Sequence, residues 1–361
     1  MNTFSFVIHP IELRRDAARK FPILGLLPER AIEKIALKLK PQHISHITGI
    51  ESATGATCEG HFIGCPLSSR QLVELPPETV YRKLVDCGKM SADLGAKIMG
   101  LGAFTSVAGD AGISVARRLE GTINVTSGNS YTVYTAVEGL LKAAHLMGLE
   151  PKNSRVAIVG ASGSIGAVCA KILAPDVASL ALIGRDLGKL DALKTQLCAQ
   201  NSDVHVTSDI RAALREADLV LAVSSAGKDL IFPEDLKSGA VVCDVARPRD
   251  VSKSVVEKRD DVLVIEGGVI EVPGDVRFNF DFGFPEKTAF ACMSETMLLA
   301  LEGTFESYTL GRDLSVEKVL HTGEMARKHG FQLAGFRAFE TSVTDETIER
   351  IRHNAARKRE V

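Results

Sequence analysis

A glycine-rich turn between a short apolar strand and a helix constrains the fold of this chain more than any other feature. The β-branched apolar run 155–159 (RVAIV) stops at Gly160, and glycines recur at Gly163 and Gly166 before an apolar helical pattern begins. Such a turn lets backbone N–H groups at a helix N-terminus approach a pyrophosphate. The spacing is GxxGxxG, with Ala161 at a glycine position of the usual GxGxxG pattern. The turn therefore predicts dinucleotide binding, and an ordinary strand-to-helix turn without a ligand remains the alternative.

The end of the next predicted strand, 179–183, indicates which dinucleotide is expected. A carboxylate at this position accepts hydrogen bonds from a ribose 2′-OH, whereas an arginine accommodates a 2′-phosphate. Here Gly184 takes the place of the carboxylate, and Arg185 and Lys189 follow it. NADPH is therefore the expected cofactor, and Asp186 is a candidate N-cap of the following helix. The residues expected to hold the cofactor are Gly160, Ser162, Gly163, Ser164, Ile165, Gly166, Arg185 and Lys189.

A βαβ rhythm extends from this turn over the middle of the chain. Strands are predicted at 155–159, 179–183, 204–207, 219–223, 240–244 and 262–266. Their alternation with helical segments predicts a doubly wound parallel sheet of the Rossmann type, an α/β fold. We expect a mixed α/β substrate domain at 1–150, the nucleotide domain at 151–285 and a helical segment at 286–361. Because no Pro-, Gly- or Ser-rich linker follows residue 285, the C-terminal helices are expected to pack back on the first domain.

Composition excludes several function classes. A net charge of −2 gives no bulk attraction to nucleic acid, and an aromatic content of 5% without Trp argues against a base-stacking surface. Seven cysteines, an odd number with no C-x-x-C pair, favour a reduced cytoplasmic protein without a metal site. The sequence has neither a signal peptide nor an apolar stretch of 18 residues, so no transmembrane segment is expected.

Three segments are expected near the reactive end of the cofactor, beyond the carboxyl ends of strands. Ser224 and Ser225 follow the fourth predicted strand of the nucleotide domain, although a plain polar turn is an equal alternative. Gly267 and Gly268 follow the last strand and permit close backbone approach. On the substrate and nicotinamide side, the polar motif that opens a helix before the nucleotide domain supplies Thr126, Ser127, Gly128, Asn129 and Thr132.

A cysteine in the apolar helix expected at 286–301 suggests the chemistry. Cys292 and Glu295 share one face of that helix, two turns after its expected start. A buried cysteine is usually a small hydrophobic residue. A thiol nucleophile would nevertheless suit attack on an acyl thioester, which gives an enzyme thioester that a hydride can reduce.

Several motifs make the chain resemble the long-chain acyl-carrier-protein reductases that form fatty aldehydes, best known from cyanobacteria. The resemblance covers most of the length. The motifs are FVIH at 6–9, GLGAFTS at 100–106, TSGNSYTVYTA at 126–136, GASGSIGAVCAKIL at 160–173, EGGVIE at 266–271, AFACMSETMLLALEGTF at 289–305 and KHGF at 328–331. Two departures are Ser164, where the family has an acidic residue, and Tyr131, where it has histidine.

The resemblance implies a fatty-aldehyde-forming reductase of hydrocarbon biosynthesis with Cys292 as the acyl-enzyme residue. It implies acyl carrier protein or coenzyme A as acyl donor, an aldehyde-consuming enzyme as a partner, and Mg²⁺ as an aid to activity. His9, at the end of the first predicted strand, is a candidate acceptor for the thiol proton, and a plain backbone hydrogen bond is the alternative.

An acidic carrier protein would need a basic docking surface. The basic residues considered for it are Arg350, Arg352, Arg357, Lys358 and Arg359 in the tail and Arg14, Arg15, Arg19 and Lys20 near the start. Simple solvation of charged helix faces is the alternative. Two other functions remain open: an NADP oxidoreductase of a small polar substrate, built like shikimate dehydrogenase or glutamyl-tRNA reductase, and a non-catalytic NADPH-sensing protein.

Overall fold

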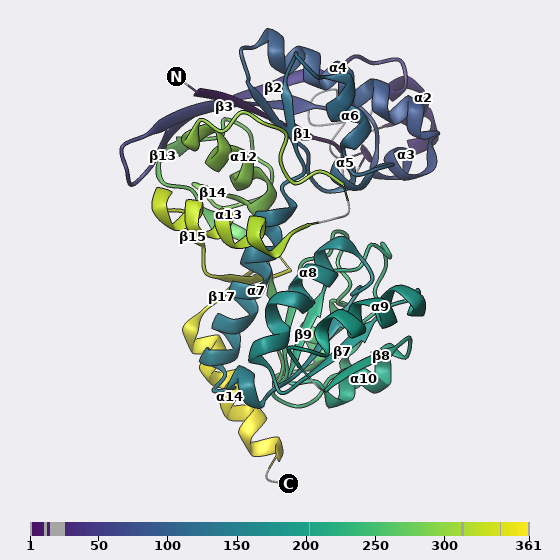
Figure 1. The fold of residues 1–361 in the computed structure, drawn as a ribbon, viewed down its shortest axis with the longest axis vertical. Helices are drawn as coiled ribbons and strands as arrows, with labels where there is room; N and C mark the ends of the chain where they lie inside the picture. Colours follow the sequence, from purple (N-terminus) through teal and green to yellow (C-terminus); the bar gives the residue numbers. More distant parts are fainter. Residues whose placement is uncertain are drawn as a thin grey trace. The chain divides into compact units, whose positions relative to one another are not determined.

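The chain forms two compact units, each assembled from several stretches of sequence (Figure 1). A computed structural model describes residues 2–10, 13–14, 26–201, 203–311, 314–339 and 341–359. Unit 1 comprises Met1–Asn129, Glu271–Asp313 and Glu324–Gln332, and unit 2 comprises Ser130–Ile270, Leu314–Gly323 and Leu333–Val361. No helix among the described residues is both long and apolar enough to cross a membrane.

Unit 2 contains the predicted doubly wound sheet. Its six strands, all parallel, have the order β11-β10-β9-β6-β7-β8, so the chain starts in the middle of the sheet and winds outward in both directions. The strands are β6 (Arg155–Val159), β7 (Ser179–Ile183), β8 (Val204–Thr207), β9 (Leu219–Ala222), β10 (Val241–Asp244) and β11 (Leu263–Glu266). All six lie within one residue of their predicted bounds, and the α/β class is confirmed.

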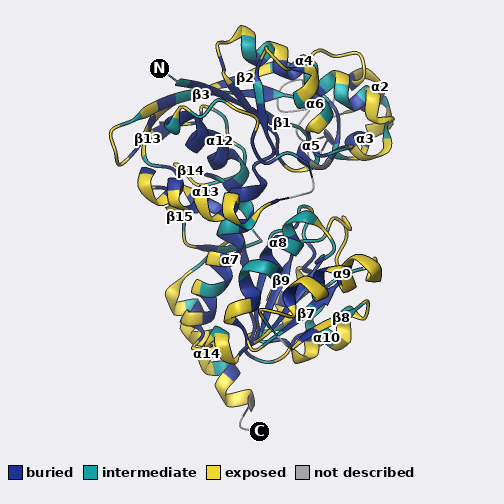
Figure 2. Ribbon diagram, in the orientation of Figure 1, coloured by how far each residue is buried: buried dark blue, intermediate teal, exposed yellow. Residues whose placement is uncertain are grey.

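Both faces of this sheet are covered, which explains its nearly continuous apolar strands. Along β6, Val156 and Ile158 belong to one apolar core, and Ala157 and Val159 belong to the core on the opposite face. The strands are buried and the outer helix faces are exposed (Figure 2). The helices are α7 (Asn129–Leu146), α8 (Ser164–Leu173), α9 (Leu187–Leu197), α10 (Ile210–Glu216), α11 (Ser254–Lys258) and α14 (Asp345–Arg359), with 3₁₀ turns at Pro151–Asn153, Ala174–Asp176 and Pro233–Asp235.

Two helices belong to unit 2 that the sequence did not assign to the nucleotide domain. The buried side chains of Val133 and Leu140 in α7 complete its core, so the boundary expected near residue 150 lies between residues 129 and 130. Ile348 and Ile351 place α14 on the same core. The expectation that the C-terminal helices pack on the first domain therefore differs from the structure for α14.

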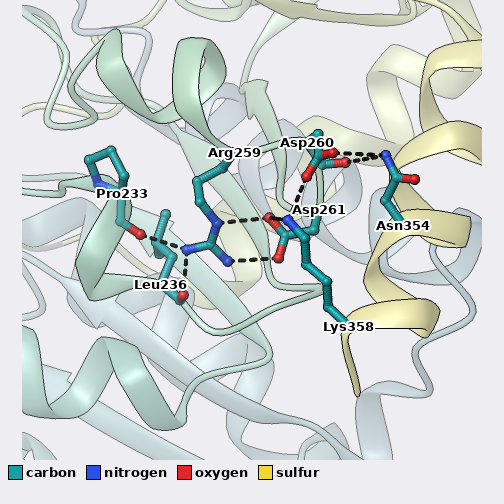
Figure 3. A network of polar contacts seen from close by, with 7 residues as sticks. All are labelled: Pro233, Leu236, Arg259, Asp260, Asp261, Asn354 and Lys358. Atoms are coloured by element: carbon teal, nitrogen blue, oxygen red, sulfur yellow. Dashed lines mark hydrogen bonds and ion pairs between the residues drawn. The ribbon is translucent and has the colours of Figure 1, made fainter. Parts of the chain in front are cut away.

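A polar network also holds α14 on unit 2 (Figure 3). Lys358 near the end of α14 donates to Asp260 at 2.6 Å and lies 3.3 Å from Asp261, and Asn354 donates to Asp260. Arg259 donates to both carboxylate oxygens of Asp261 at 2.7 and 2.9 Å. The same guanidinium donates to the backbone carbonyls of Pro233 and Leu236, so it ties the turn at 233–236 to Asp261.

Unit 1 contains a mixed six-stranded sheet in the order β13-β2-β3-β1-β4-β5. Its strands are β1 (Asn2–Ile8), β2 (Gln42–Glu51), β3 (Thr57–Gly64), β4 (Ile98–Gly100), β5 (Asn124–Thr126) and β13 (Gly274–Arg277). Strands β3, β1, β4 and β5 are parallel. Their carboxyl ends therefore meet at one edge, which the turns after β4 and β5 extend.

Helices cover both faces of this sheet. On one face, Leu84 of α4 (Pro77–Asp93) packs with Val7 and Ile63. On the other, α12 (Ala291–Glu302) packs against β1, β3 and β4, and every residue from Met293 to Leu301 is buried. Other helices among the described residues are α2 (Glu29–Ala36), α3 (Ser69–Glu74), α5 (Phe104–Val107) and α6 (Ile113–Arg118). Helix α13 (Val316–His329) has residues 316–323 in unit 2 and residues 324–329 in unit 1. Short strands form the sheet β14-β12-β15 and the pair β16-β17, with bounds Val269–Glu271 (β12), Thr288–Phe290 (β14), Gln332–Leu333 (β15), Phe336–Ala338 (β16) and Thr341–Val343 (β17).

Candidate active site

Cys292 lies in the first turn of α12. The helix begins at Ala291, not near residue 286 as expected, because residues Thr288–Phe290 form strand β14. Cys292 is half-buried, whereas both of its neighbours in sequence are buried. The thiol is therefore near the positive end of the helix dipole and still partly accessible, which is an environment that favours a thiolate.

Two glycine-containing turns, after β4 and after β5, lie against Cys292. A Cβ at Gly102 would lie 3.2 Å from Sγ of Cys292. A Cβ at Gly128, whose φ is +76°, would lie 2.5 Å from Cα of Cys292 and 2.7 Å from its carbonyl oxygen. A side chain at Gly128 would collide with the backbone of Cys292, and one at Gly102 would collide with the Phe6 ring and crowd Sγ of Cys292. The GLGAFTS, TSGN and FACMSE motifs, far apart in sequence, meet at this thiol.

Glu295, one turn further along α12, is fully buried beside the same turn. Thr126 Oγ1 donates to Glu295 Oε1 at 2.6 Å, and the Thr309 hydroxyl donates to the same oxygen. The two threonine hydroxyls are 3.1 Å apart, and Ser127 Oγ donates to the backbone carbonyl of Thr309. Thr309 has a φ of +42°, which is unusual for a β-branched residue. Two buried threonine hydroxyls therefore converge on one carboxyl oxygen of Glu295.

The other predicted residues near this motif have different surroundings. His9 Nδ1 lies 3.1 Å from the carbonyl oxygen of Pro10, the backbone bond considered as the alternative, and its ring packs edge-on against Phe104. A role of His9 toward Cys292 stays a prediction. Asn129 is buried at the start of α7, and Thr132 is half-buried in its first turn. Burial raises the pKa of Tyr131 far above its usual value, so this side chain remains protonated.

In unit 2, the glycine turn has the compact form that its spacing predicts. A Cβ at Gly160 (φ +93°) would lie 2.8 Å from Cα of Ser224, and one at Gly166 would lie 2.5 Å from the carbonyl oxygen of Gly160. Gly163 is the exposed N-cap of the ten-residue helix α8 and offers no side-chain cap. The first N–H groups of α8, at Ser164 and Ile165, therefore remain for an anion.

The end of β7 presents basic side chains around an open depression of about 700 Å³ lined by Ser162, Arg185, Asp186, Leu187 and Lys189. Asp186 caps α9, as predicted, by accepting from the N–H of Lys189 at 3.1 Å, and its carboxylate pairs with the Lys189 ammonium at 3.2 Å. Arg185 is exposed and makes no ion pair or hydrogen bond with the described residues. Arg185 is therefore better placed than Lys189 to bind a phosphate.

The two remaining predicted segments pack within unit 2. Ser224 donates to Asp250 through its N–H at 2.9 Å and its hydroxyl at 2.6 Å, while Ser225 is exposed. A Cβ at Gly267 would lie 2.8 Å from Cγ2 of Val245, so this glycine serves close packing, and Gly268 has a φ of +82°. Their cofactor roles stay predictions.

Sequence reasoning did not identify two residues that the structure brings to the predicted ones. They are Thr309, which contacts Thr126 and Glu295, and Asp250, which accepts from Ser224. Each lies in a segment without a motif, and only the fold brings it to its partner. The sequence did indicate Glu295, because its helical spacing places it on the same helix face as Cys292.

Cys292 differs from the other cysteines in its exposure. Burial raises the pKa of both Cys58 and Cys169 to about 12 and raises that of Cys243 further. Cys198 is exposed on the surface of unit 2. Within the described part of the chain, no group of three or more His, Cys, Asp or Glu residues could hold a metal ion, so nothing there supports the expected Mg²⁺.

The predicted basic surface is only partly described. Arg15, Arg19 and Lys20 lie outside the described residues, as does the side chain of Arg359, and Arg14 is exposed. In α14, Lys358 pairs with Asp260 and Arg352 donates weakly to the carbonyl of Leu146. Arg350 and Arg357 are exposed.

Comparison with known proteins places these features in a family. The sequence model of the shikimate/quinate 5-dehydrogenase family matches residues 142–266, which is most of unit 2. The chain is 37% identical over 286 residues to the aminotransferase PigE of a Serratia species, covering 78% of this chain and 33% of PigE. It is 27% identical over 143 residues to the glutamyl-tRNA reductase of Streptococcus sanguinis, covering 39% of this chain and 32% of that protein.

A third relative matches almost end to end. The chain is 30% identical over 305 residues to the long-chain acyl-[acyl-carrier-protein] reductase of Synechococcus elongatus, covering 81% of this chain and 87% of the relative. The match includes both units, whereas the chain spans only about a third of the other two relatives. The chain therefore belongs to the oxidoreductase family of the Synechococcus elongatus reductase.

Proposed function

We propose that this chain reduces a long-chain acyl thioester to the fatty aldehyde, with NADPH as reductant and Cys292 as the residue that carries the acyl group. One observation supports this above all others: the turns at Gly102 and Gly128 lie against a half-buried cysteine in the first turn of a buried helix. Two turns that are distant in sequence thus come together beside the one cysteine that is neither fully buried nor fully exposed.

The surroundings of Cys292 suit nucleophilic attack on a thioester. The N-terminus of α12 stabilises the thiolate form. The Sγ–C bond forms at the acyl carbonyl and the bond from that carbonyl to the donor sulfur breaks, so the donor leaves as a thiol after taking a proton. The two glycines let the turns after β4 and β5 pack directly beside Cys292.

A row of phenylalanines supports an apolar substrate. Phe62, Phe282, Phe284 and Phe290 follow one another with ring centroids 5.5, 5.6 and 4.4 Å apart, and Phe278 packs beside Phe282 at 5.2 Å. Phe282, Phe284 and Phe290 are half-buried, and Phe290 is the N-cap of the helix that carries Cys292. The row therefore offers an alkyl chain aromatic surface that ends two residues from the thiol.

The cofactor site has the properties that NADPH requires. The glycine turn and the uncapped N-terminus of α8 would hold the pyrophosphate, and Arg185 would bind the 2′-phosphate. When bound, NADPH supplies the hydride that converts the acyl group to the aldehyde level. The acyl donor is proposed to be acyl carrier protein or coenzyme A, by analogy with the Synechococcus relative.

Intact mass spectrometry without NADPH tests this function directly. Incubation with palmitoyl thioester should add one palmitoyl group, which peptide mapping should place on Cys292. The background should be Cys198→Ser, because Cys198 is the exposed thiol most open to non-specific acylation. With NADPH, that protein should release hexadecanal, and Cys292→Ser should give neither adduct nor aldehyde. Aldehyde formation at an undiminished rate in Cys292→Ser would refute the covalent mechanism.

A second candidate is the oxidation of a small polar alcohol, because the shikimate/quinate 5-dehydrogenase family model matches the nucleotide-binding segment. NADP⁺ reduction with shikimate or quinate, and no adduct with palmitoyl thioester, would favour it. The Phe row beside Cys292 argues against a small polar substrate.

A further inference from the structure

Glu295 is a fully buried carboxyl group that the proposed reaction does not yet use. Resting on the proposed function, we propose that Glu295 accepts the proton of the Cys292 thiol when that thiol attacks an acyl group. Three observations carry the proposal: the shared helix face, the shared turn and the hydroxyl groups that hold the carboxylate.

Cys292 and Glu295 are adjacent on one face of α12. Residues three apart on a helix have Cβ atoms about 5–6 Å apart. Strand β5 and the turn after it contact both residues: Thr126, the last residue of β5, donates to Glu295, and Gly128 lies against the backbone and Cβ of Cys292. One short segment of the chain is therefore in contact with both residues.

The hydroxyl donors hold the ionised form of Glu295 in place. Thr126 and Thr309 both donate to Oε1, and hydroxyl groups that donate to one oxygen favour the carboxylate. Full burial opposes this charge, because a buried carboxylate lacks the hydration that water would give it. A buried carboxylate held by two hydroxyl donors is therefore a suitable acceptor for a proton from a neighbouring thiol.

The elements packed on α12 contribute few other titratable groups. Strands β1, β4 and β14 contain none within their bounds. Strand β3 contributes Cys58, which donates to the carbonyl of Met297 and whose pKa burial raises to about 12, while Glu59 and His61 alternate to the opposite face. Other titratable residues lie near the ends of these elements. They are His9 after β1, Glu306 and Tyr308 before Thr309, and Glu302 with His329 at the far end of α12.

The proton balance of the acylation step closes without another reactant. Glu295 takes the proton from Sγ, the thiolate forms a bond to the acyl carbon, and the bond from that carbon to the donor sulfur breaks. The donor leaves with the proton that Glu295 held, which returns the carboxylate. No oxidant or reductant is needed in this step.

The experiment measures the rate of Cys292 acylation by palmitoyl thioester against pH, without NADPH, in the Cys198→Ser background. With Glu295 present, the rate should stay nearly constant from pH 6.5 to 8.5. In Glu295→Gln the rate at pH 7 should fall about 100-fold. It should then rise about tenfold per pH unit toward pH 8.5, because the thiol must ionise into solvent.

The matched control is Glu33→Gln. Glu33 is also a buried carboxylate of unit 1, where it accepts from Ser68 at 2.8 Å and from Arg70, but it lies in α2, outside the Cys292 site. This variant should retain the flat pH profile. Thr309→Ser, which keeps a hydroxyl donor, should also retain it. An unchanged profile in folded Glu295→Gln would overturn the proposal.

The protein with Glu295 intact provides a test that does not depend on how the variants fold. If its acylation rate climbs tenfold per pH unit from 6 to 8, Cys292 behaves as a solvent-exposed thiol and the proposal is wrong. Alkylation of Cys292 by iodoacetamide, followed by mass mapping, should show the same pH profiles without an acyl substrate. Failure of acylation together with the expected alkylation profiles would refute the proposed function and leave the role of Glu295 standing.

Discussion

Gly128 shows how a single hydrogen atom in place of a side chain can shape a site. Its φ of +76° and its contact with Cys292 are two separate reasons for glycine, one conformational and one steric. Gly55 has only the conformational reason, because its φ is +81° and a Cβ there would meet nothing within 4 Å.

We therefore expect Gly128→Ala to disturb the site more than Gly55→Ala. Gly55→Ala should cost about 1–2 kcal/mol from backbone conformation alone. Gly128→Ala should cost about 1–3 kcal/mol more, because the start of α12 must move. Urea unfolding measures the loss of stability in both variants. The rate of Cys292 alkylation should change only in Gly128→Ala. Equal stabilities of the two variants would contradict the contact.

Arg185 should determine the preference for the phosphorylated cofactor. Arg185→Ala should weaken NADPH binding by about 1–3 kcal/mol and leave NADH nearly unaffected, because only NADPH has the 2′-phosphate. Lys189→Ala should have a smaller effect, since Asp186 already neutralises that ammonium group at 3.2 Å. Titration with both cofactors, followed by nicotinamide fluorescence, tests this. Equal losses for NADPH and NADH in Arg185→Ala would show that the residue is structural.

At the scale of residues, the sequence indicated which side chains are candidates for chemistry, but it did not indicate the partners that they contact. Cys292, the glycines and the Asp186 cap follow from local spacing, which the sequence displays directly. Thr309 and Asp250 could not be predicted, because their partners are 14 and 26 residues away and no local pattern marks the contact.

Helix α14 is the element whose placement the sequence missed. Its polar anchor is the Arg259–Asp261 pair with Lys358 and Asn354 around it (Figure 3). Burial opposes ionisation of Asp261, but the hydrogen bonds from Arg259 outweigh it and lower its pKa to about 2. An amphipathic tail helix could cover either unit, and the choice depends on partners such as Asp260 that have no pattern of their own.

This anchor gives unit 2 an acid-sensitive stability. An unfolded aspartate titrates near pH 4, so the ionised Asp261 contributes stability above about pH 4, and this contribution is lost as the pH falls toward 2. Asp261→Asn should cost about 3 kcal/mol at pH 7, because Arg259 then lacks its counter-charge. Between pH 5 and pH 2, the melting temperature of this variant should fall less steeply than that of the unchanged protein. Lys358→Ala should have little effect, since that ion pair is largely exposed. Parallel pH curves for Asp261→Asn and the unchanged protein would refute the assignment.

At the scale of the whole molecule, neither unit is one continuous stretch of chain. The sequence predicted the sheet of unit 2 well, because each βαβ repeat is local. It assigned α7 to the wrong unit because the composition of an apolar helix between two domains fits either domain. The assignment follows only from the contacts of side chains such as Leu140, which is buried in the core of unit 2.

Thiol labelling can test whether each unit has its own core. Cys169 and Cys243 lie in the core of unit 2, and Cys65 and Cys87 lie in that of unit 1. Leu140→Ala should cost about 3 kcal/mol in unit 2 and speed labelling of its two cysteines. Leu84→Ala should do the same for the two cysteines in unit 1. Identical labelling of all four in both variants would show that the chain opens as one cooperative block.

At Thr309, the backbone conformation favours glycine, whereas the hydrogen bond to Glu295 requires a hydroxyl side chain. A chain optimised for folding alone would carry glycine there, because a β-branched residue at a φ of +42° is strained. Thr309→Gly should relieve this strain but also remove a hydroxyl donor from the buried Glu295 carboxylate, whereas Thr309→Ser keeps that donor. Cys292 should therefore be acylated more slowly in Thr309→Gly than in Thr309→Ser.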